Sequence, residues 1–517
     1  MDGAREETTS APEAVTSERP GVAVRSGPAV VPRHARVRAW AGRHRWFLVV
    51  FGVAAALRVT AALGFRPVLW FPDSYTYVVT ALRPSPDLVR PAGYSMFLRV
   101  LEPFHSFAVV AFAQHLFGLA MGVVVYVVAG RFAPRWMAVV AASPVLLDAY
   151  QIQLERLLVS DTLFALLVVA ATGIAMRRDP GPRAGVAVGL LLAGATLTRS
   201  IGLPLIVVVG VWFLSRARGR RWRRVGPAVA LAVAVLLPVG GYAAWFWGTH
   251  HRFGLVGANG VFLYARTMSF ADCAVMRPPG DLAVLCDPRP PSARPPSQEY
   301  IWDDDSPLVR LPGITFLART DALAGRFAVL AIRSQPLDYL ASVAAELVRS
   351  FTWGRPVYPT QEIYDLYEFP AASPPPPSRG PATLGVRLAE QYERGPITTS
   401  IVEPYAGILR GYQDVARLPG TVLVAVLLVP PLAAATRRLR RLRPDRAAGP
   451  RQGNRRPSGE VRRYGPAEWV LPWTTAVVLL VVPAATAEFD YRYVLPAVPL
   501  AFLAGATALR RHSDQGG

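Results

Sequence analysis

Long apolar runs recur along the sequence, and this feature limits the possible fold more than any other. Crossing a hydrocarbon core of ~30 Å takes ~20 mostly apolar residues. Runs of about that length predict membrane spans at about 46–65, 106–130, 136–150, 157–176, 184–198, 200–215, 226–247, 419–436, 466–486 and 493–509. The third, fifth and sixth runs are short for full spans. We therefore expect an all-α polytopic membrane protein with about ten transmembrane helices, which as a whole could not fold as a soluble globule.

Positive charge is concentrated between these apolar runs. Lys and Arg number 56 against 35 Asp and Glu, for a net charge of +21. All of these basic residues are Arg, a bias typical of a GC-rich genome such as that of an actinobacterium. Because the Arg clusters lie in short segments between apolar runs, anionic membrane lipid is a better partner for them than nucleic acid.

The position of the Arg clusters predicts the orientation of the chain in a cell membrane. Short cytoplasmic loops carry an excess of basic residues. The dense clusters all fall on one side of the predicted topology, at residues 33–45, 131–135, 177–183, 216–224 and 437–463. We therefore expect both termini in the cytoplasm of an inner or plasma membrane and the long segment 248–418 outside.

These patterns divide the chain into five parts. Residues 1–45 contain no cleavable apolar core and predict a disordered cytoplasmic tail before a retained first helix. A transmembrane module at 46–247 and a second at 419–509 flank the extracytoplasmic domain 248–418. The second module contains the basic cytoplasmic linker 437–463, and residues 510–517 form a cytoplasmic tail.

Segment 248–418 is too long for a connector and too rich in Pro for a continuous helical bundle, so it predicts a domain of mixed and irregular structure. The stretch 316–351 has apolar residues at helical spacing, interrupted by Pro336, and predicts two amphipathic helices packed on the membrane domain. The run Pro374 to Pro377 predicts an exposed linker.

The two cysteines of the chain, Cys273 and Cys286, both fall in this outward segment. In an oxidising compartment a disulfide between them would close a short loop and stabilise it by ~3 kcal/mol or less. Two buried thiols are the alternative. Metal binding is disfavoured because no His lies close by in the sequence.

Ionisable residues at a membrane boundary are costly unless they pair or line a hydrated cavity, so those on the outer side are candidates for function. They occur in short motifs beside the predicted spans. The motifs are WFPDSY at 70–75, RPAGY at 90–94, VSDTLF at 159–164, TRSIGLP at 198–204 and EFDYRYVLP at 488–496.

The order of these motifs and their shared location on the outer side resemble those of the GT-C superfamily. Its members are membrane glycosyltransferases that use polyprenyl-phosphate sugars, as in the protein O-mannosyltransferase and lipid A aminoarabinose transferase families. The resemblance covers about residues 46–250 and 466–509 and does not extend to segment 248–418. It implies a GT-C-like fold and two partners, which are a polyprenyl-phosphate sugar donor and a glycan, glycolipid or protein acceptor. It also implies displacement with inversion.

Sugar transfer from a lipid phosphate needs a base for the acceptor hydroxyl and cations for the departing phosphate. Asp73 is the candidate base, and partial desolvation beside apolar walls is expected to raise its basicity. Arg binds phosphate with a planar fork of donors, so Arg199 and Arg492 are the first candidate phosphate ligands and Arg90 the third. Further substrate-binding candidates from the same motifs are Tyr94, Asp161 and Tyr493.

No cofactor is expected with certainty, and a divalent metal is left open. Many members of the superfamily carry a second acid next to the first-loop Asp, whereas Ser74 follows Asp73 here. This departure puts metal dependence in doubt, although Asp161 could supply a second carboxylate.

The acidic candidates also have structural interpretations. Asp73 could cap a helix that starts at Ser74. Asp161 could cap a helix or pair with Arg156.

The basic candidates have structural interpretations as well. Arg199 could satisfy the carbonyls at a helix end, and Arg492 could pair with Glu488 or Asp490. Arg58, inside the first span, is assigned no role.

Two other functions are compatible with a membrane protein of this kind. A transporter or lipid-carrier flippase often shows internal repeats, which this sequence lacks, and its acids would lie at mid-membrane. A non-catalytic scaffold for cell-wall assembly would not need the outward Asp and Arg set. The sequence also contains no Gly-rich phosphate loop that would indicate a nucleotide-driven pump.

Overall fold

The computed structural model describes residues 3, 33–216, 221–374, 380–442 and 467–509. The chain divides into two units, residues 1–45 and 46–517, each of which is described by itself. Within the first unit the described part is helical, because helix α1 begins at Arg33. The prediction of a disordered tail through residue 45 is therefore wrong for residues 33–45. Arg and Ala are strong helix formers, and a helix that is already nucleated extends easily over such residues.

Ten helices lie within the described residues 33–216 and 221–250. They are α1 (Arg33–Gly64), α2 (Pro72–Leu82), α3 (Gly93–Leu101), α4 (Phe107–Ala129), α5 (Arg135–Leu147), α6 (Ala149–Arg156), α7 (Asp161–Ala175), α8 (Pro182–Thr198), α9 (Gly202–Ser215) and α10 (Arg221–His250).

Nine further helices and then three apolar helices follow in the rest of the described residues. The nine are α11 (Asn259–Thr267), α12 (Cys273–Met276), α13 (Gly280–Ala283), α14 (Glu299–Trp302), α15 (Ala318–Ser334), α16 (Pro336–Arg349), α17 (Gln361–Asp365), α18 (Gly380–Glu393) and α19 (Tyr405–Val415). The three are α20 (Gly420–Leu442), α21 (Val470–Thr486) and α22 (Val498–Ala508). Single 3₁₀ turns occur at η1 (Glu102–Phe104), η2 (Pro291–Ala293), η3 (Tyr491–Tyr493) and η4 (Leu495–Ala497).

Fewer helices reach membrane-spanning length than the sequence predicts. Among the described residues, four helices are long and apolar enough to cross a membrane, within α1, α4, α10 and α20. The number becomes five if α5 and α6, which are bent by 46° at Asp148, form one span. Helices α7, α8, α9 and α21 are apolar but shorter. The structure thus supports a mostly helical membrane protein, while the total of ten spans stays a prediction.

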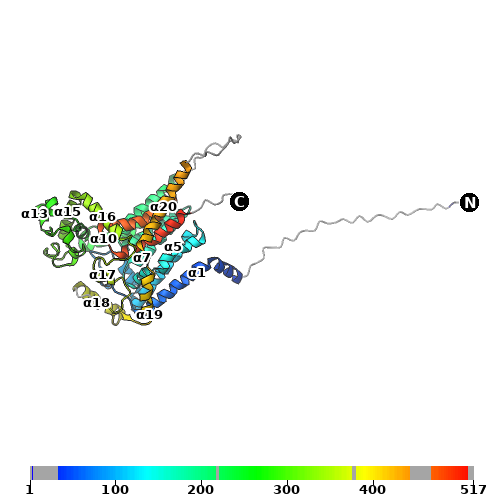
Figure 1. The fold of residues 1–517 in the computed structure, drawn as a ribbon, viewed down its shortest axis with the longest axis horizontal. Coiled ribbons are helices and arrows are strands. Elements are labelled where there is room, and N and C mark those ends of the chain that lie inside the picture. Colours follow the sequence, from blue (N-terminus) through cyan, green and yellow to red (C-terminus); the bar gives the residue numbers. More distant parts are fainter. Residues whose placement is uncertain (1–2, 4–32, 217–220, 375–379, 443–466, 510–517) are drawn as a thin grey trace. The chain divides into compact units, whose positions relative to one another are not determined.

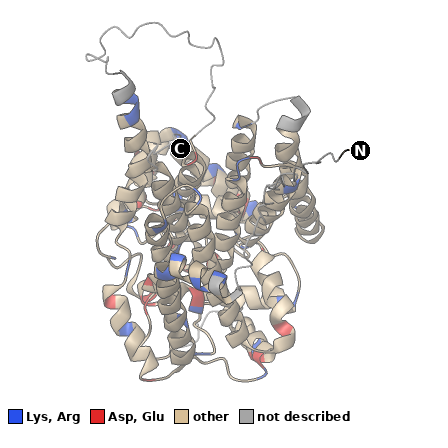
Figure 2. Ribbon diagram, turned by 90° about the vertical axis from the view of Figure 1, so that its right-hand side faces the viewer, with Lys and Arg blue, Asp and Glu red and all other residues tan. Residues whose placement is uncertain are grey.

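The long helices pack into a bundle with one extended apolar core. This core joins residues of α4, α5, α7, α8, α9, α10, α20, α21 and α22. In Figure 1, α5, α7 and α20 lie in this bundle, and α13 and α15 gather at one end of the unit. Figure 2 shows the long helices uncharged along most of their length, with acidic and basic residues together in a band below their middle. This segregation is expected where helix sides face hydrocarbon.

Segment 248–418 packs in two different ways. Helices α11 to α15 have a hydrophobic core of their own around Tyr264, Tyr300 and Phe327. Helix α18 packs instead on α2, and α19 on α6. Strands β1 (Phe65–Arg66) and β2 (Ser400–Ile401) pair antiparallel and join the segment to the end of α1. The later part of the segment thus packs against elements from residues 46–247.

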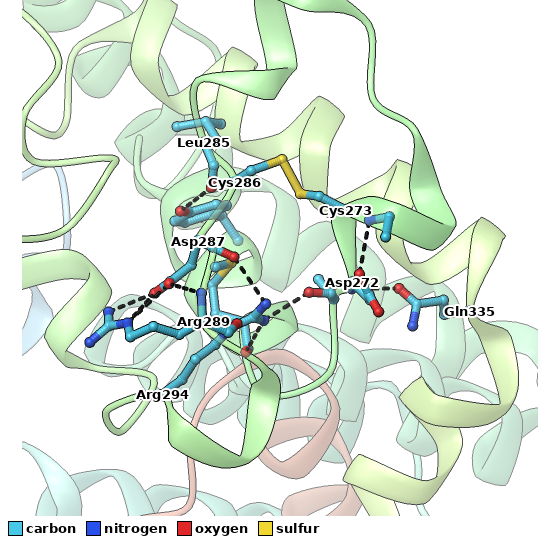
Figure 3. Close-up of a disulfide and its surroundings, with 12 residues drawn as sticks. Asp272, Cys273, Leu285, Cys286, Asp287, Arg289, Arg294 and Gln335 are labelled. Atoms are coloured by element: carbon cyan, nitrogen blue, oxygen red, sulfur yellow. Dashed lines mark hydrogen bonds and ion pairs between the residues drawn. A yellow bond between two sulfur atoms is a disulfide. The ribbon is translucent and has the colours of Figure 1, made fainter.

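Two local predictions for this segment can be compared with the structure directly. The two amphipathic helices separated by Pro336 are confirmed as α15 and α16, and Tyr339 of α16 donates to the carbonyl of Ala485 in the last turn of α21. Cys273 and Cys286 form a disulfide with Cα atoms 6.1 Å apart (Figure 3). Residues 375–377 of the predicted Pro-rich linker, residues 443–463 of the predicted linker 437–463 and the predicted tail 510–517 lie outside the described residues, whereas residues 437–442 belong to α20.

Candidate active site

Asp73 lies in the first turn of α2, where the local sequence sets the start of the helix. Pro72 is the first helical residue, a position where a missing N–H costs no hydrogen bond. Ser74 Oγ accepts the N–H of Phe71 at 2.9 Å and donates to the carbonyl of Leu158 at 2.8 Å. Asp73 therefore does not cap a helix beginning at Ser74, and its carboxylate is free to meet other segments.

Two arginines hold the Asp73 carboxylate, one on each oxygen. Arg90 donates from NH2 to Oδ1, and Arg492 donates from NH1 to Oδ2 at 2.9 Å. Asp73 and Arg492 are both 8% exposed, so water screens this contact little. Residues 419 positions apart in the sequence thus meet at one carboxylate.

Short turns present both of these arginines. Asp87 Oδ1 accepts the N–H groups of Val89 and Arg90 and shapes the loop before α3. Asp490 accepts the N–H of Arg492 at 3.2 Å at the start of η3, and its Oδ2 lies 3.0 Å from Arg492 Nε. The local pairing of Arg492 with Asp490 therefore exists alongside its contact with Asp73.

A second ion pair lies beside the first. Arg199, at the C-cap of α8, donates from NH1 to Oδ1 of Asp161, the first residue of α7. The pairing of Asp161 with Arg156 is wrong, because the Arg156 guanidinium instead donates to the carbonyls of Phe65 and Pro67.

The ring of Tyr493 joins the two ion pairs. The guanidinium carbon of Arg199 lies 5.0 Å from its centroid and that of Arg492 lies 5.5 Å away. These distances allow cation–π attraction from both cations.

Tyr94 lies behind this cluster and does not line the cavity. Its hydroxyl donates to Gln114 Oε1 at 2.8 Å, and its ring packs edge-on against Tyr77 at 4.8 Å. Gly93 allows the start of α3 to approach the end of α8 closely. A Cβ at Gly93 would lie 2.4 Å from the carbonyl oxygen of Leu197, two residues before Arg199. The RPAGY motif therefore sets the distance between α3 and the end of α8.

A cavity of about 490 Å³ opens next to the ion pairs. Its polar end contains Asp73, Tyr77, Arg90, Arg199, Arg492 and Tyr493. Its remaining wall is largely apolar and comes from α9, α11 and α21, with Pro204, Phe262, Leu263, Leu479 and Val482. The cavity thus joins a cationic end to a hydrophobic one.

The electrostatics of Asp73 differ from the expectation. Burial by itself would raise the pKa of Asp73, but Arg90 and Arg492 outweigh it and hold the pKa well below its ordinary value. The prediction that desolvation makes Asp73 more basic is therefore wrong for this arrangement of side chains. The cause is the pair of guanidinium groups, whose convergence no local sequence pattern indicates.

Metal ligands are not evident in this part of the molecule. Within the residues that the structure describes, no group of three or more His, Cys, Asp or Glu side chains could hold a metal ion. We therefore assign no residue as a metal ligand.

Two residues of the site were not selected from the sequence. Asp490 was considered only as a local partner of Arg492, yet it completes a chain of carboxylates and guanidinium groups with Asp73. Tyr77 lines the cavity and contacts Ser160 Oγ at 3.0 Å. Its spacing of four residues from Asp73 places both on one helix face and could have identified it.

A separate buried charge network lies within the helix bundle. Arg58 of α1 donates to both carboxylate oxygens of Glu155 of α6, each at 2.7 Å. His115 of α4 and Gln151 also contact this carboxylate, at 2.9 and 3.0 Å. Glu155 is fully buried, and Gln114 links its backbone carbonyl to Tyr94 behind the cavity.

Comparisons with known proteins give weak similarity. No protein-family model and no curated protein matches the sequence. Two crystal structures of the Archaeoglobus fulgidus oligosaccharyltransferase, one tethered with an acceptor peptide containing the NVT sequon via a disulfide bond and one in the apo form, give TM-scores of 0.41 and 0.42 at 12% sequence identity. The match covers 90% of this chain but only 50% and 51% of the two crystal chains. The chain therefore spans about half of their length. We draw no functional conclusion from a similarity of this size.

Proposed function

We propose that the protein is an integral membrane glycosyltransferase that transfers a sugar from a polyprenyl-phosphate carrier to a hydroxyl of an extracytoplasmic acceptor. The observation that carries this proposal is the cavity whose polar end holds Arg90, Arg199 and Arg492 beside Asp73 and whose other wall is apolar. A polyprenyl phosphate has the same division, with an anionic phosphate next to a hydrocarbon chain.

In the proposed reaction the three arginines bind the phosphate, and the apolar wall holds the first part of the prenyl chain. The acceptor oxygen attacks the anomeric carbon while the bond from that carbon to the phosphate oxygen breaks. The acceptor proton passes to the Asp73 carboxylate, and polyprenyl phosphate leaves with its charge stabilised by the guanidinium groups. This single displacement inverts the anomeric centre. The acceptor is a cell-wall glycan, a glycolipid or a protein.

Asp73→Asn tests this assignment. Asn keeps the shape of the side chain but cannot accept the proton, so the rate of transfer should fall by roughly 10²–10⁴-fold. The assay follows sugar transfer from a synthetic polyprenyl-phosphate sugar by the purified full-length protein. Asp304→Asn, which removes an exposed carboxylate outside the cavity, serves as the matched control. Turnover by Asp73→Asn close to that of the wild type would exclude Asp73 as the base and leave Asp161 as the next candidate.

We also propose that both termini face the cytoplasm and that segment 248–418 lies outside. The Arg-rich loops support this orientation. Single cysteines replacing Asp304 and Asp179, both exposed, test it with a membrane-impermeant thiol reagent on intact cells. Position 304 should react and position 179 should not, and the reverse pattern would invert the topology.

A further inference from the structure

The polar end of the cavity is already occupied by the protein's own anions. Asp73 engages Arg90 and Arg492, Asp490 engages Arg492, and Asp161 engages Arg199. Each guanidinium that the proposed function assigns to phosphate is therefore paired with a carboxylate.

Asp73 is the critical one among these anions because its two oxygens bridge two different arginines. The side chains of Asp73, Arg90 and Arg492 are between 10% and 19% exposed, so little room is left for a second anion on the same donors. A phosphate that used the same N–H donors would have to take them from Asp73.

The same contacts keep Asp73 from acting as a base. A carboxylate that accepts hydrogen bonds from two cations is a weak proton acceptor. Further charged or titratable groups surround Asp73, and Arg199 is a third cation among them. Among the described residues, these groups are Arg90, Arg492, Arg199, Asp161, Asp490, Tyr77 and Tyr493, with Tyr367 next to Asp490 and Arg492.

We propose that the donor phosphate activates the catalytic base by ion-pair exchange: it takes Arg90 and Arg492 from Asp73 and releases the carboxylate toward the acceptor. This inference rests on the proposed function and specifies how that site is regulated. Once the cations hold the phosphate, burial favours the protonated form of Asp73, which suits a group that must accept a proton. Donor therefore binds before acceptor, and without donor the base is held inactive and does not activate water.

Ion-pair exchange makes a prediction opposite to that of a simple binding residue. If Asp73 competes with phosphate for the two arginines, its removal should tighten the binding of a prenyl phosphate. Couplings of this kind are typically 5–150-fold, so Asp73→Asn should bind at least about fivefold more tightly than the wild type while losing transfer activity. A carboxylate that merely supports the fold would weaken binding or leave it unchanged when replaced.

The experiment measures the Kd of geranylgeranyl phosphate for the full-length protein in detergent, by calorimetry and by the shift in thermal unfolding. Glu403→Gln is the matched control, because it removes a carboxylate from the exposed pair with Arg410, away from the cavity. Its Kd should equal that of the wild type.

A second variant keeps the test decisive if Asp73→Asn fails to fold. Asp490→Asn removes one contact to Arg492 and should tighten binding by a smaller factor. Unchanged or weaker binding in the folded variants would overturn ion-pair exchange and leave the proposed function standing. Failure of the wild type and both variants to bind the probe would overturn the proposed function together with this inference.

Discussion

Gly118→Ala is expected to disrupt the buried network around Glu155 by a single added methyl group. Gly118 lies in α4, and a Cβ at this position would stand 1.8 Å from Glu155 Oε1 and 2.4 Å from Glu155 Cδ. Since nonbonded heavy atoms prefer about 3.5 Å or more, the carboxylate would have to retreat by roughly 1.5 Å. Such a shift breaks the hydrogen bonds that Oε1 accepts from Arg58 NH2 at 2.7 Å and from Gln151 at 3.0 Å.

The cost follows from what these hydrogen bonds do. Hydrogen bonds to charged groups contribute about 1.5–3 kcal/mol each, and breaking a buried ion pair costs about 3–5 kcal/mol. Replacing Gly by Ala inside a helix by itself stabilises the folded state by up to about 1 kcal/mol. The net destabilisation by Gly118→Ala should therefore be about 2–4 kcal/mol, and Tm should fall by several degrees.

The assay is thermal unfolding of the purified protein in detergent. Gly210→Ala in α9 is the matched control, because a Cβ at Gly210 meets no atom within 4 Å. In a Glu155→Ala background the clash is gone, so Gly118→Ala should add almost nothing to the loss. A Tm equal to that of the wild type, or a full additional loss in the double variant, would refute the reasoning.

Three further predictions follow from other parts of the structure. Arg492→Lys should lower kcat/KM less than Arg492→Ala, since Lys keeps the charge but loses the planar fork; equal losses would contradict a phosphate role. Cys273→Ser should cost ~3 kcal/mol or less and make thermal unfolding insensitive to reductant, whereas an unchanged Tm would mean that the disulfide does not stabilise the loop. Burial raises the pKa of Glu488 from 4.5 to about 6 against hydrogen bonds from Gln298, Tyr358 and Ser297. Because the folded-state pKa is the higher one, this contribution of about 2 kcal/mol is present below pH 4.5 and is lost as pH rises through 6. Tm measured from pH 4.5 to 7 should therefore fall more steeply in the wild type than in Glu488→Gln, and parallel curves would exclude the effect.

Much of the architecture could be predicted from the sequence because it depends on local patterns. The apolar runs predict helices that need a nonpolar environment, and Pro336 separates α15 from α16 because it cannot continue the helix before it. The motifs also selected Asp73, Arg90, Arg199 and Arg492, since charges beside apolar spans are rare without a function.

Helix lengths were harder to predict from the sequence because they depend on contacts with neighbouring segments. The helix within the predicted span 136–150 ends before Asp148, whose side chain caps α6 by accepting the N–H of Tyr150. Helix α1 extends to Arg33 through residues whose composition suggested disorder. In both places the average hydropathy of a window says little about the single residue at which a helix ends.

The chemistry of the candidate site was decided by the tertiary structure. The sequence by itself determined that Asp73 is a carboxylate beside apolar segments, from which a raised pKa is the natural expectation. Only the fold brings Arg492 to 2.9 Å from an oxygen of Asp73 across 419 residues, next to Arg90. Because the electrostatic energy of a buried carboxylate depends on its distance to such cations, the direction of its pKa shift is a property of the assembled site.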